Sequence, residues 1–506
     1  MPSFFICFSN EYDEVSSTVF PFTTEFLSFY RQYRKNTKFI PQDFSELLPR
    51  ILDVIIAKMQ YDETANWGDE DELTDEAEFL SVRKRVKNIQ DMVGAIDMQL
   101  LVETLHTVVK NAFDKLAQGG ASAIGWRELD LAMYELHISG DLASQNGTLF
   151  TKFENGVVPN GDTTRGLVEV VTKLLSSGMF GYQFLPLHYN TNKYPTFVGV
   201  STYPHPSIQL QYMELIVRYI SVFEFHKELI PPALESFVSN CHSSHVRVRT
   251  RSWYLFQRFV KTLRTHIVDV APTVIRAIRD LLEIKAEPSE DGDDGMSSDD
   301  GKRNDATFDS QLYLFEAVGS LSSSTSISPE RQVIFAREVM SPIFADIEKH
   351  LSLVQNGDSR GILQIHHDIL ALGTLARGFS DWAPGTKSTA PPPNRLVSDE
   401  FEKVAEAVLV SLETLHNFFL IREAARFAFS RMIGVLGLRL LPTLPRWING
   451  LLSKTSSKDE IQMFLRLLEQ VIHGFKVCFA ARTKLFSLTL YSLKSLKYLT
   501  RFSHPS

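Results

Sequence analysis

The residues with the clearest chemical potential are basic and lie between positions 244 and 264. Successive residues of an α-helix are rotated by about 100°, so a helix here gathers four cations within an arc of roughly 80° and a fifth at its margin. Apolar residues take the opposite side of the same helix. We therefore expect an amphipathic helix that packs inward and presents a basic stripe outward. The stripe is Arg247, Arg251, Arg258, Lys261 and Arg264, and the apolar side is Val248, Leu255, Phe256, Phe259 and Leu263.

A row of cations on one helix face is typical of a surface that neutralises phosphates and releases their counterions, an effect that ignores base sequence and weakens with salt. The five stripe residues are therefore our candidate RNA-binding residues. A solvated helix face, compensated by acids of the next repeat, accounts for the same pattern. Arg249 falls inside the apolar arc, and there we expect a buried pair with an acid of the neighbouring repeat.

Two further basic groups are weaker candidates. The run of Arg83, Lys84, Arg85 and Lys87 follows an acidic segment, which favours a solvated helix face that pairs with that segment. Arg422 and Arg426 are one helical turn apart and are a third possible patch, ranked lower because Glu423 lies beside them.

The sequence contains no arrangement typical of catalysis. It lacks the phosphate-binding loop, the His-Glu-x-x-His zinc motif and the Gly-x-Ser-x-Gly elbow. The adjacent residues His366 and His367 diverge by about 100° on a helix, so they predict a structural role rather than a shared metal. His242 and His245 flank two serines that better fit a helix N-cap. We expect no enzyme activity, no metal, no cofactor and no small-molecule substrate.

Bulk properties narrow the class of protein. The formal net charge of −8 argues against a generally basic nucleic-acid coat. Cys7, Cys241 and Cys478 lie far apart and predict no disulfide framework, which fits the cytosol or nucleus. The apolar start lacks a basic region and a cleavage site, so no secretory signal is expected. No uncharged apolar run reaches 18 residues, so we expect no spanning helix and no membrane partner.

The stripe helix belongs to a chain that is helical throughout. Apolar residues recur at helical spacing within 44–59, 210–223, 233–238, 253–263 and 464–472, and few runs alternate with a period of two. The expected fold is therefore all-α.

Prolines reveal a recurring unit. Pro49, Pro232, Pro272, Pro342 and Pro442 each precede an apolar helical pattern, and each is expected just before or in the first turn of a helix, where the missing N–H costs nothing. Pro232 and Pro272 are 40 residues apart, close to the roughly 40–47 residues of a HEAT or armadillo unit. Such two-helix units bury their apolar faces by stacking. We predict a right-handed α-α superhelix of HEAT/ARM-type repeats.

Composition divides the array into segments. We expect HEAT-type helices at 1–60, 81–190, 207–286 (with the stripe), 307–377 and 397–476. Between them we expect an acidic loop at 61–80, a loop at 191–206, an acidic disordered insert at 287–306 and a proline-rich loop at 378–396. The final residues, 477–506, form an atypical basic tail.

Two of these segments resemble a known family. The run YPHPSIQLQYMELIVRY at 203–219 and the run SSHVRVRTRSWYLFQRFVK at 243–261 are similar to the exportin-T family, the tRNA exportin branch of the importin-β (karyopherin) superfamily. The segment at 10–20 also resembles its central repeats. The likeness covers about 9–476, with breaks at the loops.

The resemblance implies a function. Exportin-T family members bind mature tRNA together with GTP-loaded Ran, pass the nuclear pore and release tRNA in the cytoplasm, and some affect pre-tRNA splicing indirectly. The implied partners are tRNA, RanGTP and nuclear pore proteins, and the implied location is nucleus and cytoplasm by shuttling. Recognition is of tRNA shape, backbone and processed ends, which suits phosphate-directed arginines.

Departures from the family pattern leave other functions open. Family members are much longer, and the repeats that hold most of the Ran contact have no counterpart here, so we expect a truncated or mis-assembled member. A karyopherin for protein cargo and a HEAT-type scaffold of an enzyme complex are the alternatives. Dependence of binding on salt and on GTP-loaded Ran separates these alternatives.

Overall fold

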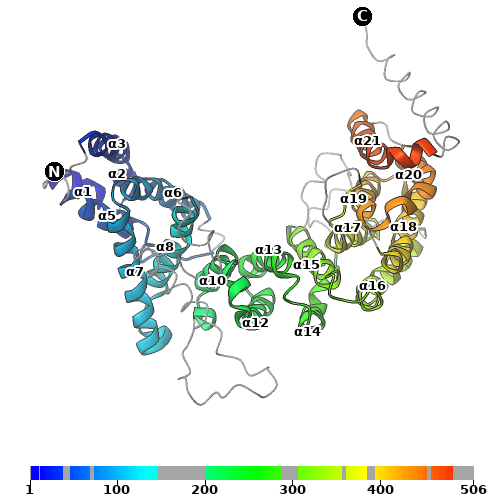
Figure 1. The fold of residues 1–506 in the computed structure, drawn as a ribbon, viewed down its shortest axis with the longest axis horizontal. Helices are drawn as coiled ribbons and strands as arrows, with labels where there is room; N and C mark the ends of the chain where they lie inside the picture. Colours follow the sequence, from blue (N-terminus) through cyan, green and yellow to red (C-terminus); the bar gives the residue numbers. More distant parts are fainter. Residues whose placement is uncertain are drawn as a thin grey trace, which may run out of the picture. The chain divides into compact units, whose positions relative to one another are not determined.

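The computed structural model describes residues 2–10, 12–37, 46–68, 73–145, 200–286, 306–355, 361–384, 394–452 and 457–481. Over these ranges every regular element is a helix, which confirms the expected all-α fold (Figure 1). The chain divides into two compact units, Met1–Leu255 and Phe256–Ser506, and the division falls within helix α13 (Val246–Leu263).

In the first unit, helices that follow one another along the chain pack against each other. Helix α6 packs against α3, α5 and α7, and helix α8 packs against α7 and α10. The bounds are α1 Pro2–Phe8, α2 Asp13–Ser17, α3 Phe20–Thr37, α5 Leu47–Lys58, α6 Leu73–Ile96, α7 Met98–Gly119, η1 Gly120–Ser122, α8 Trp126–Gln145, η3 Val200–Thr202, α10 Pro206–Arg218, α11 Val222–Phe225, η4 Lys227–Leu229 and α12 Ile230–Cys241.

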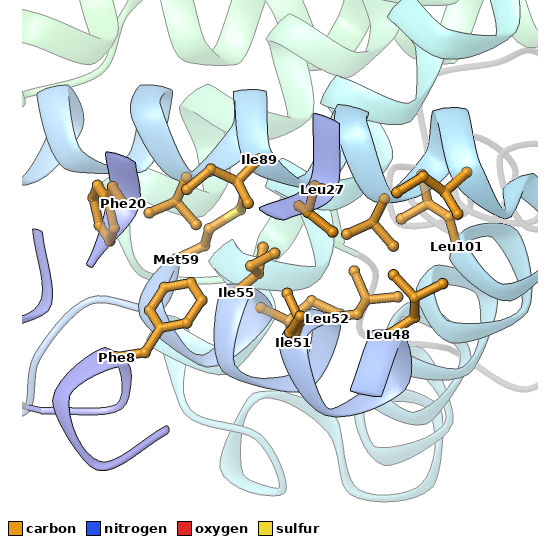
Figure 2. Close-up of a cluster of buried hydrophobic side chains, with 14 of the residues drawn as sticks. Phe8, Phe20, Leu27, Leu48, Ile51, Leu52, Ile55, Met59, Ile89 and Leu101 are labelled. Carbon is orange, nitrogen blue, oxygen red and sulfur yellow. The ribbon is translucent and has the colours of Figure 1, made fainter. Parts of the chain in front are cut away.

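A buried apolar cluster joins the first helices of this unit. Side chains of α5 converge with side chains of α1, α3, α6 and α7 (Figure 2). Leu27, Leu52, Ile55 and Met59 have no exposed surface. Full burial of one such side chain stabilises the folded state by about 1.5–3 kcal/mol, so this cluster supplies the cohesion that one helix pair lacks.

The second unit has two layers of helices. Helices α15, α17 and α19 follow one another in one layer, and α16, α18 and α20 follow one another in the other. The bounds are α14 Ala271–Ala277, η5 Arg279–Leu282, α15 Ala306–Ser322, α16 Pro329–Gln355, α17 Gly361–Phe379, α18 Arg395–Leu415, α19 Phe419–Leu436, η7 Gly437–Thr443, α20 Leu444–Leu452 and α21 Lys458–Ala481. In HEAT-type repeats each helix packs against the helix two positions further along the chain, which gives two layers of this kind.

The proline pattern holds at four positions and fails at one. Pro49, Pro232 and Pro272 lie in first turns, and Pro442 lies within the 3₁₀ helix η7, two residues before α20 begins. The prediction was wrong for Pro342, which lies inside the 27-residue helix α16. An interior proline costs about 3 kcal/mol or more. Buried apolar residues of α16 on both sides of it, among them Val339 and Ile343, offset that cost.

The first acidic segment is shorter than the sequence predicted. Helix α6 begins at Leu73, so the second half of the expected loop at 61–80 is helical. Asp75 and Glu76 lie in the first turn, where negative charge complements the helix dipole. Acidic composition therefore marked a helix start there. Much of the expected loop at 191–206, of the acidic insert, of the proline-rich loop and of the basic tail lies outside the described residues, as does part of the helical segment 81–190.

Among the described residues, one stretch is long and apolar enough to match a membrane span by composition, Phe419–Leu452, and 56% of its most apolar window is buried. It comprises α19, η7 and α20, which pack against α17 and α18. Helix α19 also buries Arg422 and Arg426. This packing accounts for its apolar composition as a core helix. Cys7 and Cys241 are both free thiols.

Candidate nucleic-acid interface

Helix α13 is amphipathic in the predicted phase. Val248, Leu255, Phe256, Phe259 and Leu263 have no exposed surface, which confirms the apolar side. Trp253 donates a hydrogen bond from Nε1 to the Cys241 carbonyl at 3.1 Å. This bond ties α13 to the end of α12 and fixes the direction in which the stripe faces.

The first two stripe residues pair with acids of earlier helices. Arg247 Nη1 donates to both carboxylate oxygens of Glu76 at 2.6 and 2.7 Å, and its guanidinium lies 4.5 Å from the centre of the Trp67 ring. Arg251 Nε donates to Glu214 Oε1 at 2.7 Å. The compensating acids that the alternative interpretation required are therefore present at both positions.

The last two stripe residues pair in the same way within the second unit. Lys261 Nζ lies 3.1 Å from Glu316 Oε1, and Arg264 Nη1 lies 2.7 Å from Asp381 Oδ2. Arg258, between the two pairs along α13, is exposed.

In two of these ion pairs the side chain of the cation is much more exposed than the side chain of the acid. The Arg247 side chain is 39% exposed and its partner Glu76 is 8% exposed; for Lys261 and Glu316 the values are 40% and 6%. In these two pairs the carboxylate lies behind its cation, which keeps N–H groups open to solvent, whereas Asp381 is as exposed as its partner Arg264, at 41% and 37%. The exposed N–H groups of each cation can contact a phosphate while the nearly buried acid keeps its own hydrogen bond to the same side chain. The face is compensated in charge and still accessible to an anion.

The prediction for Arg249 was wrong. Its Nη1 donates to the Ser243 carbonyl at 3.0 Å, in the turn before α13, rather than to an acid of another repeat. The carbonyls of Ser243 and Ser244 precede α13 and have no backbone partner within the helix. The Arg249 guanidinium, in the first turns of α13, donates to the Ser243 carbonyl. Ser243 Oγ accepts from the His245 amide at 3.3 Å, so this serine shapes the turn before the helix.

In the second basic group, 83–87, one residue is buried and another pairs within its own helix. Arg83 is buried and donates to Asp130 Oδ2 at 2.8 Å, with its guanidinium 3.8 Å from the Tyr134 ring centre. The expected solvated face paired with the acidic loop is wrong for this residue. Lys87 instead pairs with Asp91 at 2.6 Å on the same helix.

Arg422 and Arg426 do not form a surface patch. Both are buried and share Glu460: Arg422 Nε and Arg426 Nη1 donate to its Oε2 at 2.9 and 2.7 Å. Burial opposes ionisation of Glu460, but the two guanidinium groups outweigh it and lower the pKa of that carboxyl. A carboxylate between two arginines holds α19 to α21.

The histidine-rich segment of α17 is interior. Burial lowers the pKa of His366 to about 4, with the neighbouring His367 adding to the effect. Burial and the charge of Asp346 raise the pKa of Asp368 to about 9. Near neutral pH both groups are uncharged. Over the described residues no group of three or more acidic, His or Cys side chains is arranged to hold a metal.

The comparisons with known proteins agree with this fold. The exportin-T family model matches residues 1–483. The chain is 49% identical over 479 residues to exportin-T of Aspergillus niger, covering 94% of this chain and 44% of that protein. It is 49% identical over 470 residues to exportin-T of Phaeosphaeria nodorum, covering 93% and 43%. The chain belongs to the exportin-T family.

A solved structure supports the fold of this family member. The structure described as importin13 in its cytosolic state matches with a TM-score of 0.61 at 13% identity, over 94% of this chain and 49% of the other. At that identity the likeness shows the fold alone. The chain spans less than half the length of the exportin-T relatives that it matches.

The motifs that carry the family resemblance have clear structural roles. In α10, His205 is the N-cap and its Nδ1 accepts from the Ser207 amide at 3.3 Å, with Pro206 in the first turn. The His205 ring also stacks on Trp126, with centres 4.1 Å apart and planes within 5°. No pattern in the sequence predicted this stack, and none linked Trp67 in the acidic loop to Arg247. Both contacts join segments far apart along the chain.

Proposed function

We propose that this exportin-T family member is part of a tRNA nuclear export receptor. In this proposal it binds tRNA together with GTP-loaded Ran, carries the tRNA through the nuclear pore by contact with pore proteins, and shuttles between nucleus and cytoplasm. It performs no catalysis, and its effect on pre-tRNA splicing is indirect. Family membership supports the class of cargo, and the stripe on α13 supports the site.

One observation carries the RNA-binding part of the proposal. The stripe cations of α13 keep more than a third of their side-chain surface exposed, while Glu76 and Glu316 are nearly buried behind them. Guanidinium and ammonium groups at helical spacing suit contact with successive phosphates of a folded RNA backbone. Such contacts read shape and charge rather than base sequence, as a receptor for all tRNAs requires.

The test is retention of the purified chain on immobilised tRNA, with and without GTP-loaded Ran, across a salt series. The stripe variant carries Arg247→Gln, Arg251→Gln and Arg258→Gln. A control variant removes the same charge from exposed and partly exposed positions of the second unit, with Arg395→Gln, Arg439→Gln and Arg446→Gln. We expect the stripe variant to bind tRNA roughly tenfold or more weakly and with a shallower salt dependence, and the control variant to bind as the wild type does.

Retention that requires both tRNA and GTP-loaded Ran supports the export function in full. Absence of tRNA retention at every salt concentration, with or without Ran, contradicts it and favours a receptor for protein cargo or a scaffold. Equal tRNA binding by the stripe variant and the wild type contradicts the placement of the site on α13.

A further inference from the structure

Charged side chains from four helices gather at the C-terminal end of α17. Lys261 Nζ and Arg377 Nε approach the same oxygen of Glu316, at 3.1 and 3.5 Å. The neighbouring pair of Arg264 and Asp381 closes the group at 2.7 Å. We call this the α17 cluster, and its members are Lys261 from α13, Arg264 directly after α13, Glu316 from α15, Arg377 at the end of α17, Asp381 two residues after α17, and Arg431 from α19.

The cluster is built on an unusually close backbone contact. A Cβ atom on Gly378 would lie 2.8 Å from the Gly319 Cα, so α15 and α17 meet there without side chains between them. Ser323 Oγ also donates to the Gly378 carbonyl at 3.1 Å. Glu316 lies one turn before Gly319, and Arg377 directly precedes Gly378. The contact therefore fixes the relative positions of this acid and this base, which is what a preorganised binding surface needs.

Arg431 adds to the cluster a cation with an unused N–H group. Its Nε is buried and has no hydrogen-bond partner among the described residues, and its guanidinium lies 5.0 Å from the Phe427 ring centre. Burial, followed by the positive charge of Arg377, lowers the pKa of Arg431, while Glu316 opposes this. A guanidinium with a buried, unused N–H beside a second guanidinium is an environment that an anion would stabilise.

The charges in the cluster do not balance. Four cations face two carboxylates, and Glu316 is shared by at least two of the cations. An ordinary structural clamp would pair each base with an acid, as Arg446 does with Glu406 and Glu413 on α18. Arg377 is also 46% exposed, so the surplus positive charge reaches solvent.

We propose that Arg377 and Arg431 act with Lys261 as a second phosphate-contacting site, on α17 and α19, for the folded backbone of an RNA. This inference rests on the proposed function in one respect, that the cargo is tRNA. Helices in contact lie about 8–10 Å apart, so a backbone that crosses α17 and α19 meets cations of both. Glu316 serves as the internal counterion that a phosphate replaces.

The experiment compares the full chain with its Arg377→Gln, Arg431→Gln and Glu316→Gln variants by fluorescence anisotropy, with labelled tRNA and, separately, with a short inorganic polyphosphate. Arg446→Gln is the matched control, because Arg446 is a similarly exposed arginine of the same unit, 38% exposed, paired with two acids. We expect Arg377→Gln to weaken tRNA binding roughly three- to tenfold and to reduce the slope of log affinity against log salt by about 1. Glu316→Gln should tighten binding, and Arg446→Gln should leave it unchanged.

The outcomes distinguish this inference from the proposed function. If tRNA binds and the stripe variant is impaired, but Arg377→Gln and Arg431→Gln bind as the wild type does, the second site is refuted and the export function stands. If tRNA does not bind, while polyphosphate binds in a manner that depends on Arg377, the anion site stands and the tRNA receptor is refuted. Failure of both probes overturns both. Circular dichroism of each variant checks that Arg431→Gln, which alters a partly buried position, retains the fold.

Discussion

Two regions of this chain carry arginines four residues apart on one helix, and the two pairs have opposite roles. On α13, Arg247 and Arg251 each have an acid of their own and remain 39% and 46% exposed. On α19, Arg422 and Arg426 share Glu460 and are almost fully buried. The spacing is identical, so the difference comes from the packing around each helix. A cation with its acid on the protein side stays exposed and can contact a ligand. Two buried cations that share one acid instead hold two helices together, and we call the group of Arg422, Arg426 and Glu460 the internal joint.

The strongest test of this comparison removes the internal joint. Glu460→Ala leaves two buried guanidinium groups without their carboxylate, which we expect to lower the free energy of unfolding by about 3–5 kcal/mol. Chemical denaturation of the purified chain measures it. Glu413→Ala is the matched control, because it removes a carboxylate from the exposed pair with Arg446, where less than about 1 kcal/mol is at stake. Equal effects of the two substitutions would remove the distinction between the regions.

A buried acid without a cation gives the next largest effect. The pKa of Asp368 in the folded state is about 9, above its value of about 4 in an unfolded chain. Between these values the folded state holds a proton that the unfolded state has released, so the free energy of unfolding falls as pH rises from about 4 toward 9. Asp368→Asn removes this contribution.

We therefore expect Asp368→Asn to gain stability relative to the wild type as pH rises, on the order of 4 kcal/mol between pH 4 and pH 7. Thermal and denaturant unfolding across this range measure the slope, which is independent of any constant packing cost of the new amide. The exposed substitution Asp459→Asn on α21 is the control for added positive charge. A parallel pH profile for Asp368→Asn and the wild type would contradict the assignment.

Arg249 offers a smaller test, because it is a base on α13 whose partner is a backbone carbonyl. Arg249→Gln removes the 3.0 Å bond to the Ser243 carbonyl, which we expect to cost about 1 kcal/mol of stability. Because Arg249 lies outside the stripe, tRNA affinity should stay within about twofold of the wild type, apart from the general loss of one charge. A loss of affinity as large as that of a stripe substitution would place Arg249 in the interface.

The smallest expected effect concerns the acids behind the stripe. Glu214→Gln frees Arg251 from its 2.7 Å pair, so a phosphate no longer competes with a carboxylate. We expect tRNA affinity to rise roughly two- to fivefold at low salt, with less than about 1 kcal/mol change in stability. Glu224→Gln on α11 removes the same charge from an exposed position away from the stripe. An equal rise in both variants would indicate a general electrostatic effect rather than local competition.

The amino-acid sequence predicted what depends on local periodicity. The apolar phase of α13 is visible in 18 residues, and the same holds for the first-turn prolines of α5, α12 and α14. The pairings were not predictable in this way. Glu76 and Arg247 are 171 positions apart, and Lys261 and Glu316 are 55 apart. Which acid meets which base depends on how the repeats stack, and one helix does not encode that.

The same limit explains the errors at Arg83, Arg422 and Arg426. A cluster of bases in a sequence does not show whether the packing of other helices will leave it exposed or bury it against an acid. Asp130 is 47 positions from Arg83, and Glu460 is 38 positions from Arg422. Only the folded chain brings each acid to its arginine. Pro342 is a comparable case, because burial along the whole of α16 overrides a residue that ends most helices.

The burial of helix α17 has a consequence that is independent of the phosphate site proposed at its end. Sixteen of its 19 residues are buried, on every side of the helix, and it packs against α15, α16, α18 and α19. Its amides should therefore be among the slowest in the second unit to exchange with deuterium, since local opening there exposes several interfaces at once. The helices of this unit that bury fewer of their residues should exchange their amides faster than α17 does.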